Sequence, residues 1–358
     1  MSGASRRVSL KNRKILIRRN VLKGIAAACA APFATLPARA QASLRAEYEA
    51  FVNDIAAKHN LDLIALRRLF AQIKPQPSII RAMNAPSTAL PWHAFRKGHV
   101  DAVRINGGVK FWHQHAATLA RAAREFGVPE EIICATIGIE THYGGYTGNF
   151  RILDALATLA FDYPKRAEFF RGELEQFLLM GKEAGKEASL DLAGLKGSYA
   201  GAMGIPQFMP SSYRKYAVDF DGDGKKNLWS SVPDVIGSVA NYYKLHEWQP
   251  GEVIAVPASV NGRPDVALMA ALIDDITPKT SISEFRKLGI QPATQSAAVN
   301  DDALAALLPL ETESGTQYWF GFKNFYVITR YNRSTNYAMA VHEIAEAIKA
   351  GIKSARRT

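Results

Sequence analysis

One segment in the middle of the chain constrains its fold more than any other. Residues 129–145 read PEEIICATIGIETHYGG, with two acids at the start, an apolar run in the middle and a glycine-rich end. Pro129 suits the first turn of a helix, and Glu130 and Glu131 favour its positive end. The apolar middle is typical of a buried helix. The sequence therefore predicts a helix in the interior of the protein.

Glu140 is the exception within this apolar run. Ile133, Thr136, Ile137 and Glu140 have the spacing of one helical face. Burial on that face and the negative end of the helix would both raise the pKa of the carboxyl group. A carboxylic acid protonated near neutral pH suits protonation of a glycosidic leaving oxygen. The alternative is a glutamate at a solvent edge, and spacing alone does not decide between the two.

The remaining chain is mostly helical, with strands near its end. Helical spacing of apolar residues predicts helices over 43–75, 108–126, 153–186, 232–246 and 337–353. A proline-containing loop is expected between 74 and 95, and glycine and proline punctuate 194–224. From about residue 252, β-branched and aromatic runs, including 251–260 and 317–331, predict strands. A helix over 281–289 interrupts them.

The first 42 residues have the parts of an export signal. A basic segment is followed by the apolar stretch VLKGIAAACAAPFATLPA and by the small-residue cleavage sites ARA (38–40) and AQA (40–42). The RRNVLK of 18–23 resembles a twin-arginine signal, although Val21 stands where phenylalanine is common. Export to the periplasm is expected, by the twin-arginine or the ordinary route. A basic disordered tail fits less well, because the apolar stretch follows directly.

The positive charge belongs mainly to that signal. Residues 1–40 hold nine basic and no acidic side chains, and subtracting these nine from the net charge of +11 leaves +2. A nearly neutral mature chain argues against a nucleic-acid partner.

Neither cysteine nor any apolar segment predicts a membrane anchor. Cys29 follows AAA, a poor match to a lipoprotein cleavage box, so lipid anchoring is not expected. The apolar stretch of the signal is too short for a span of about 20 residues, and no transmembrane span is predicted for the mature chain. Cys134 then remains without an internal disulfide partner and is interpreted as core packing.

Three long motifs resemble one family, the lytic murein transglycosylases of the membrane-bound B type (glycoside hydrolase family 103). They are GIETHYGGYTGNFRILDALATLAF at the start of 138–180, LKGSYAGAMGIPQFMPSS at the start of 195–243, and FKNFYVITRYNRSTNYAMAV at 322–341. The resemblance extends from about residue 45 to 350. It implies cleavage of the β-1,4 bond between N-acetylmuramic acid and N-acetylglucosamine in peptidoglycan glycan strands. The product would carry a 1,6-anhydromuramoyl end, and catalysis would need no cofactor.

The resemblance also implies a fold class, α+β and predominantly α, with a lysozyme-like helical core. The predicted parts are the export signal (1–42), an N-terminal helical section (43–100), the catalytic core (101–250), a small β-containing section (251–325), and a return to the core with a C-terminal helix (326–358).

This chemistry explains how one carboxylate suffices. A glycosidase that uses water needs a second carboxylate at a defined separation. Here the C6 hydroxyl of the sugar would attack, so Glu140 would act as an acid and then as a base. Asp154 is a nearby acid, interpreted as a structural residue at a helix start.

Other positions are assigned only through matching motifs. Ser198, Gln207, Tyr331, Asn332 and Tyr337 resemble family residues that line the sugar site. Amide and hydroxyl groups suit sugar recognition and tyrosine rings suit stacking, but each residue read alone fits core or turn structure. Phe95 falls where the family commonly has tyrosine, so a hydroxyl role is absent there.

An acidic loop at 219–229, DFDGDGKKNLW, begins like an EF-hand. Asp219, Asp221 and Asp223 take positions 1, 3 and 5, Gly224 takes the sharp turn, and Lys225 offers its backbone carbonyl. Position 12 is Ser230, not glutamate, and Asp234 matches a later ligand in the family. A structural calcium ion bracing the loop is predicted; the alternative is a solvated acidic turn.

Two other functions stay open at this point. The same fold could serve a muramidase-type hydrolase, which the mass of the product ends would reveal. A non-catalytic peptidoglycan-binding protein is disfavoured by the intact motif around Glu140.

Overall fold

The computed structural model describes residues 38–84, 90–183, 190–262, 266–293 and 299–355, without the side chains of 38–45, 266 and 267. The chain divides into two compact units, residues 1–48 and 49–358. The described part of the first unit is the beginning of α1 (Ala38–His59). The predicted export signal, with RRNVLK and Cys29, lies outside the described residues except for 38–42 at the start of that helix.

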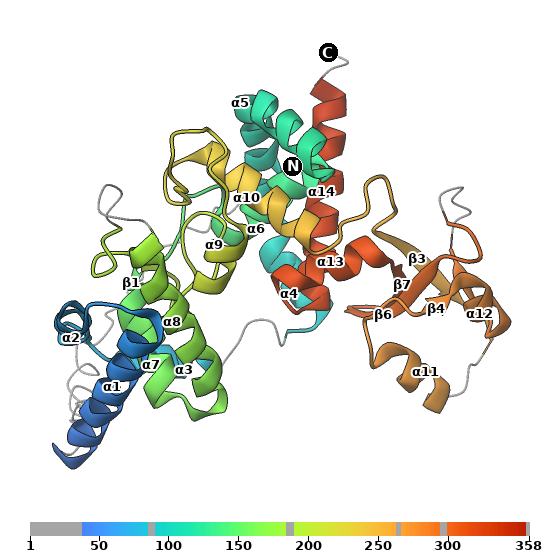
Figure 1. Cartoon of the computed structure of the whole chain (residues 1–358). Coiled ribbons are helices and arrows are strands. Elements are labelled where there is room, and N and C mark those ends of the chain that lie inside the picture. Colours follow the sequence, from blue (N-terminus) through green and yellow to red (C-terminus); the bar gives the residue numbers. More distant parts are fainter. Residues whose placement is uncertain (1–37, 85–89, 184–189, 263–265, 294–298, 356–358) are drawn as a thin grey trace, which may run out of the picture. The chain divides into compact units, whose positions relative to one another are not determined.

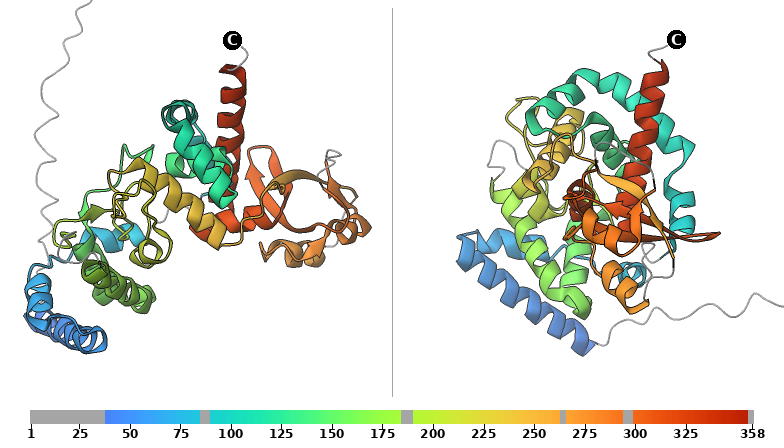
Figure 2. Two further views of the ribbon diagram at one scale, coloured as in Figure 1. Left: turned by 45° about the horizontal axis from the view of Figure 1, so that its top comes forward. Right: turned by 90° about the vertical axis from the view of Figure 1, so that its right-hand side faces the viewer.

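The helix predicted from PEEIICATIGIET is confirmed as α6 (Glu130–Thr141), and it is buried almost completely. Three long helices pack against it: α5 (Ala102–Phe126), α10 (Val232–Leu245) and α14 (Thr335–Ala355) (Figures 1 and 2). All three were expected from apolar spacing. α5 ends at Gly127, which adopts the left-handed conformation that favours glycine (φ 75°). The apolar composition of α6 is thus explained by its enclosure.

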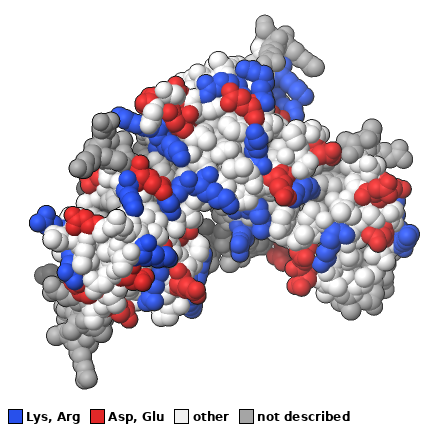
Figure 3. All heavy atoms as spheres, viewed as in Figure 1, with Lys and Arg blue, Asp and Glu red and all other residues white. Residues whose placement is uncertain are grey.

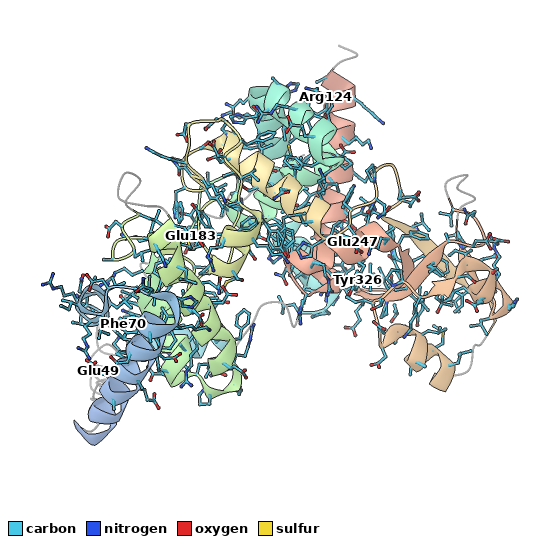
Figure 4. The ribbon with its side chains drawn as sticks, in the orientation of Figure 1. Glu49, Phe70, Arg124, Glu183, Glu247 and Tyr326 are labelled. Atoms are coloured by element: carbon cyan, nitrogen blue, oxygen red, sulfur yellow. The ribbon has the colours of Figure 1, made fainter. Side chains whose placement is uncertain are left out.

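A second group of helices includes α7 (Ile152–Asp162) and α8 (Ala167–Glu183), which pack on each other. The sequence predicted one helix over 153–186. The chain instead breaks at Pro164, which begins a short 3₁₀ turn (Pro164–Arg166), because proline cannot donate the next helical hydrogen bond. α9 (Pro210–Tyr216) packs on α8, where Arg214 pairs with Glu183 at the end of that helix (Figure 4).

The segment between residues 74 and 95 is more regular than predicted. After α2 (Leu63–Phe70), it contains α3 (Pro77–Met83) and the start of α4 (Trp92–His99). Pro77 lies in the first turn of α3, and Pro91 is the N-cap of α4. These prolines start helices, where a missing N–H costs nothing. A short ladder pairs β1 (Phe150–Arg151) with β2 (Lys196–Gly197).

The late part of the chain forms an antiparallel sheet in the strand order β4-β6-β7-β3-β5. Its strands are β3 (Ala255–Val260), β4 (Thr280–Ser281), β5 (Ile290–Pro292), β6 (Leu304–Thr312) and β7 (Gly315–Gly321). The predicted helix at 281–289 forms as α12 (Ile282–Lys287), and α11 (Val266–Ile273) is additional. Leu307 and Phe320 pack with Phe285 of α12, whereas Leu308 joins the core cluster of the helices.

The predicted strand over 317–331 is wrong in its second half. β7 ends at Gly321, and residues 323–331 form α13 (Lys323–Tyr331). Phe325 and Ile328, three residues apart, are buried in the helical core. Asn324 anchors the start of the helix by accepting from Gln249 N (2.8 Å) and donating to Gln249 O (2.8 Å). Tertiary packing therefore outweighs the strand preference of these residues.

The predicted class, α+β with a predominance of helices, is confirmed. Cys134 is fully buried in the core, as expected. Within the described ranges, no helix has both the length and the apolar character to cross a membrane. Acidic and basic side chains are interspersed on the face shown in Figure 3.

Candidate active site

Glu140 lies one residue before the end of α6, and an unusual turn follows it. His142 and Tyr143 both adopt left-handed backbone conformations (φ 50° and 60°), a costly choice for residues other than glycine. Thr141 holds the turn by donating to Ile205 O (2.8 Å) and accepting from Gly144 N (3.0 Å). The end of α6 is thus held in one geometry.

Tyr143 explains the glycine within the motif. Its hydroxyl donates to Arg104 O (2.7 Å), which directs the ring back over α5 and α6. A side chain at Gly138 or Gly108 would collide with this tyrosine. The glycine two residues before Glu140 therefore serves close packing.

The Glu140 carboxyl group is half-buried and has one bonded oxygen. The hydroxyl of Tyr337, the third residue of α14, donates to Oε1 at 2.6 Å. The Tyr337 ring stacks on Tyr331 with 6.4 Å between centroids and 13° between planes. Among the described residues, Oε2 has no hydrogen-bond partner. This oxygen is the one available for proton exchange with a ligand.

Burial raises the pKa of Glu140 from its ordinary value of 4.5 to about 7. The hydrogen bond from Tyr337 acts in the opposite direction, because it stabilises the carboxylate. The direction expected from the sequence is confirmed. A group with a pKa near 7 has both protonation states accessible at neutral pH.

Asp154, the nearby acid, has a structural role. It is 3% exposed, its Oδ1 accepts from Lys74 N (2.9 Å), and Arg151 lies 3.6 Å from its Oδ2. It ties the segment after α2 to α7 and does not cap its own helix. Its interpretation as a structural residue is confirmed, with a different partner from the one expected.

Gln207 is held in a strained backbone conformation beside the Glu140 turn. Its φ is 53°, and its Nε2 donates to Thr147 O (3.0 Å) and Gly204 O (2.8 Å). Among the described residues, none donates to its side-chain oxygen. The amide is therefore oriented by the protein and keeps an acceptor for a ligand.

Ser198 lies in a turn that touches the same segment. Its Oγ accepts from Ala200 N (3.2 Å) and Ala202 N (3.0 Å), which leaves the hydroxyl hydrogen for donation. A side chain at Gly148 would collide with Gly197 and Ser198, so the two turns lie against each other. The structure thus brings Ser198 and Gln207 to the turn that follows Glu140.

The other predicted positions differ in what they offer. The Tyr331 hydroxyl donates to Pro206 O (2.6 Å), next to Gln207, and Asn332 is a half-buried residue that ends α13. Phe95 is 3% exposed and stacks on His99 at 3.9 Å, so its ring belongs to the core and offers a sugar little surface.

Two exposed tyrosines were not singled out from the sequence. Tyr146 is 69% exposed, and its backbone N–H donates to Thr141 O (3.0 Å), beside Glu140. Tyr199 is 38% exposed and follows Ser198 directly. An aromatic residue within a glycine-rich turn is not expected to pack in the core, and this pattern in the sequence could have identified both tyrosines as exposed.

The acidic loop gathers part of the predicted metal set. Carboxylate oxygens of Asp219, Asp221 and Asp223 lie within 4.8 Å of one another, a hard-oxygen set that fits calcium. Asp234 is not in this group. It is fully buried, and it accepts from Phe220 N and Asn227 N, both at 2.7 Å. These bonds close the loop, and the role of Asp234 as a calcium ligand stays a prediction.

The loop is joined to the segment that carries Gln207. Leu228 O accepts from Ile205 N at 2.8 Å, and a side chain at Gly204 would collide with Leu228. The Tyr213 hydroxyl donates to Lys226 O at 2.6 Å. The backbone of Lys225, the predicted carbonyl ligand, lies in this loop, and its N–H donates to Asp223 Oδ1 (2.8 Å).

Comparisons with known proteins show which family the chain resembles. The family model described as Transglycosylase SLT domain matches residues 43–346. Membrane-bound lytic murein transglycosylase B of Escherichia coli (strain K12) is 45% identical over 308 residues, which cover 83% of this chain and 81% of the relative.

Two similar solved structures contain bound ligands. Escherichia coli lytic transglycosylase Slt35 in complex with calcium is 44% identical, with a TM-score of 0.75, covering 85% of this chain and 93% of that one. SltB3 from Pseudomonas aeruginosa in complex with NAG-anhNAM-pentapeptide is 29% identical, with a TM-score of 0.74, covering 86% of this chain and 79% of that one. The lysozyme-like, mainly helical architecture is shared.

Proposed function

The chain belongs to the transglycosylase SLT domain family and is a lytic transglycosylase acting on peptidoglycan; on this premise we propose that it cleaves the β-1,4 bond between N-acetylmuramic acid and N-acetylglucosamine and leaves 1,6-anhydromuramoyl ends. The observation that carries the proposal is Glu140 itself. It is a half-buried acid with a pKa of about 7, one oxygen bonded to Tyr337 and the other without a partner among the described residues.

Glu140 acts twice in the proposed reaction. Protonated Glu140 donates its proton to the glycosidic oxygen as the bond from this oxygen to the anomeric carbon of the muramoyl residue breaks. The resulting carboxylate then takes the proton of the C6 hydroxyl while O6 bonds to the anomeric carbon. The proton returns to Glu140, so no water is consumed and no second carboxylate is required.

The surrounding residues orient the sugar in this scheme. Gln207 presents an acceptor and Ser198 a donor beside the Glu140 turn, and Asn332 supplies a further amide. Tyr337 is buried and orients the Glu140 carboxyl group through its hydroxyl, while Tyr331, stacked on it, is half-buried. The N-acetyl group of the substrate and the ring faces are the features that such groups recognise. The complex of SltB3 with NAG-anhNAM-pentapeptide supports a peptidoglycan fragment as the ligand.

Mass spectrometry of digested peptidoglycan tests the proposal. Purified sacculi treated with the protein should release fragments lighter by one water than hydrolysed ones, carrying anhydro ends. Fragments with reducing ends would instead identify a muramidase, and no release at all would identify a binding protein.

We also propose that the acidic loop binds a structural calcium ion. Asp219, Asp221 and Asp223 would supply side-chain oxygens and Lys225 its carbonyl; the calcium complex of Slt35 supports this. The ion would brace the loop that holds Ile205 and, through it, the Gln207 segment. At a calcium concentration of about 100 times Kd, unfolding should cost about 2.7 kcal/mol more than in chelator. An Asp221→Asn variant, the matched control, should lose this calcium response.

Export to the periplasm remains a proposal that rests on residues 1–42. Blocking the twin-arginine translocase should leave the chain in the cytoplasm if RRNVLK is the signal. A chain still exported under this block uses the ordinary route.

A further inference from the structure

We propose that the protein carries a second, non-catalytic pocket that binds a neutral N-acetylated pyranose of the glycan strand. The pocket is a cavity of about 450 Å³, within the range of about 300–1,000 Å³ typical of small-molecule sites. We call it the tryptophan pocket; the lining residues that matter are Trp248, Trp319, His342, Glu131, Glu346 and Lys349. The choice of a glycan as ligand rests on the proposed function.

The tryptophan pocket is separate from the catalytic turn. It is lined by Pro129, Glu131 and Ile132 at the start of α6, whereas Glu140 lies at the other end of this helix. Glu140 follows Glu131 by nine positions of α helix, about 13.5 Å along the axis. A ligand in one site therefore does not displace a ligand in the other.

Two tryptophans from different elements line the pocket. Trp248 follows α10, and its backbone N–H donates to Tyr243 O (3.0 Å). Trp319 lies in β7 between Pro257 of β3 and Leu308 of β6, and its ring meets His342 of α14 edge-on at 6.2 Å. An indole offers a flat apolar face with one polar N–H. A pyranose has the matching features, an apolar C–H face and a polar rim.

The polar groups of the pocket favour a neutral ligand. Glu131 pairs with Lys349 at 2.7 Å, while Glu346 and Glu252 add two more carboxylates to the lining. Three acids against one lysine disfavour an anion. Carboxylates accept hydrogen bonds from hydroxyl groups, so a neutral sugar fits this charge better than a phosphate or a free carboxylate.

Two lining residues also carry unsatisfied polar atoms. The Nε1 of Trp248 and the Nδ1 of His342 are buried and have no hydrogen-bond partner among the described residues. Trp248 is 6% exposed. Such groups cost free energy unless a ligand or an ordered water satisfies them. Because both residues line the pocket, a bound sugar is a candidate partner for these two nitrogens.

A second binding site would strengthen the binding of an insoluble polymer substrate. Binding one part of a glycan network keeps another part near the catalytic turn at a high effective concentration. The advantage disappears for a short soluble fragment that occupies one site only. This difference provides a functional readout.

The direct test uses triacetylchitotriose and the indole N–H signals of the full-length protein in ¹⁵N-labelled form. The chain has five tryptophans, and we expect the signals of Trp248 and Trp319 to shift saturably. Trp319→Ala should abolish the shift of Trp248, and Trp319→Phe should keep it. Tyr318→Ala, the matched control on the same strand but packed in the other core cluster, should leave it unchanged. Signals that do not respond in the wild type would overturn the proposal.

Activity on two substrates separates this inference from the proposed function. Trp319→Ala should digest intact sacculi about tenfold more slowly at limiting substrate, yet process short soluble glycan at the wild-type rate. Equal rates of variant and wild type on both substrates would overturn the functional role of the pocket. A wild type that forms no anhydro ends would refute the proposed function. The shifts of the indole N–H signals test binding in the tryptophan pocket independently of this activity.

Discussion

Glu140 and Glu173 are glutamates on helices, the first half-buried and the second buried, and burial raises the pKa of each. Their partners differ. Both oxygens of Glu173 accept from Ser211, Oε2 from the backbone N–H (2.9 Å) and Oε1 from the hydroxyl (2.7 Å). Glu140 has a single bond, from Tyr337, and Oε2 without a partner among the described residues.

The comparison shows that burial alone does not identify a reactive acid. Glu173 joins α8 to the start of α9, much as Asp154 and Asp234 use their carboxylates to hold backbone N–H groups. A carboxylate whose oxygens accept hydrogen bonds from the protein stabilises the fold. A carboxyl group with a raised pKa and an open oxygen is available for proton transfer. The difference between the two glutamates leads to four predictions.

The largest effect should come from Glu140→Gln. The amide keeps the shape of the side chain but does not transfer a proton, so the rate of anhydro-end formation should fall by about a thousandfold or more. Quantitative mass spectrometry of digested sacculi measures this rate. Glu173→Gln is the matched control and should keep wild-type activity per folded molecule. A Glu140→Gln enzyme with near-wild-type activity would remove the distinction between the two sites.

The second effect concerns stability and its pH dependence. The folded-state pKa of Glu140, about 7, lies above its ordinary value of 4.5. The group therefore contributes stability below pH 4.5 that is lost as the pH rises through 7, up to about 3 kcal/mol. Because glutamine does not titrate, Glu140→Gln should gain stability relative to wild type between pH 5 and pH 8. Denaturant unfolding at both pH values measures the gain, and a difference independent of pH would contradict the assignment.

The third effect is the structural counterpart at Glu173. Glu173→Gln replaces one acceptor by an N–H₂ group that faces the donors of Ser211, so the free energy of unfolding should fall by about 1–2 kcal/mol. Ser211→Ala removes only the hydroxyl donor and should cost less. Unfolding curves of the three proteins give the order. An unchanged stability of Glu173→Gln would mean that these bonds do not hold α9.

The smallest effect should come from Tyr337→Phe. Loss of the hydroxyl should lower kcat/KM by about tenfold, equivalent to one hydrogen bond. It should also raise the pKa of Glu140 above 7, because the lost bond favours the carboxylate. The basic limb of the pH profile should therefore move to higher pH. Tyr331→Phe, which loses a bond to Pro206 O instead, should leave this limb in place.

The candidate site shows how far sequence reasoning reached. Apolar spacing within the 12 residues of α6 predicted the buried helix but left open whether Glu140 is buried, and the family motif favoured the buried acid. The gathering of Asp219, Asp221 and Asp223 follows from the spacing of one loop. The predicted sugar-site residues, such as Gln207 and Tyr337, came from family motifs, since each alone fits core or turn structure.

The wrong strand prediction has a clear cause, which is packing between distant segments. Residues 323–331 have strand-forming side chains, but the buried contacts of Phe325 and Ile328 make them helical. The hydrogen bonds that Asp234 accepts from Phe220 N and Asn227 N likewise join positions apart in the chain, while its role as a calcium ligand stays a prediction. Neither outcome has a local signal in the sequence.

The sequence by itself determined a helical protein with a protonatable glutamate at the end of a buried helix and an acidic loop. Local periodicity and spacing suffice for the helices and the acidic loop, because these depend on neighbouring residues. The role of Glu140 also required the family motifs. Only the tertiary structure decided which acid keeps an open oxygen. Tyr337 donates to Glu140 although the two residues are 197 positions apart in the chain, and Ser211 donates to Glu173 although they are 38 positions apart. Both bonds result from the packing of helices, which no local pattern encodes.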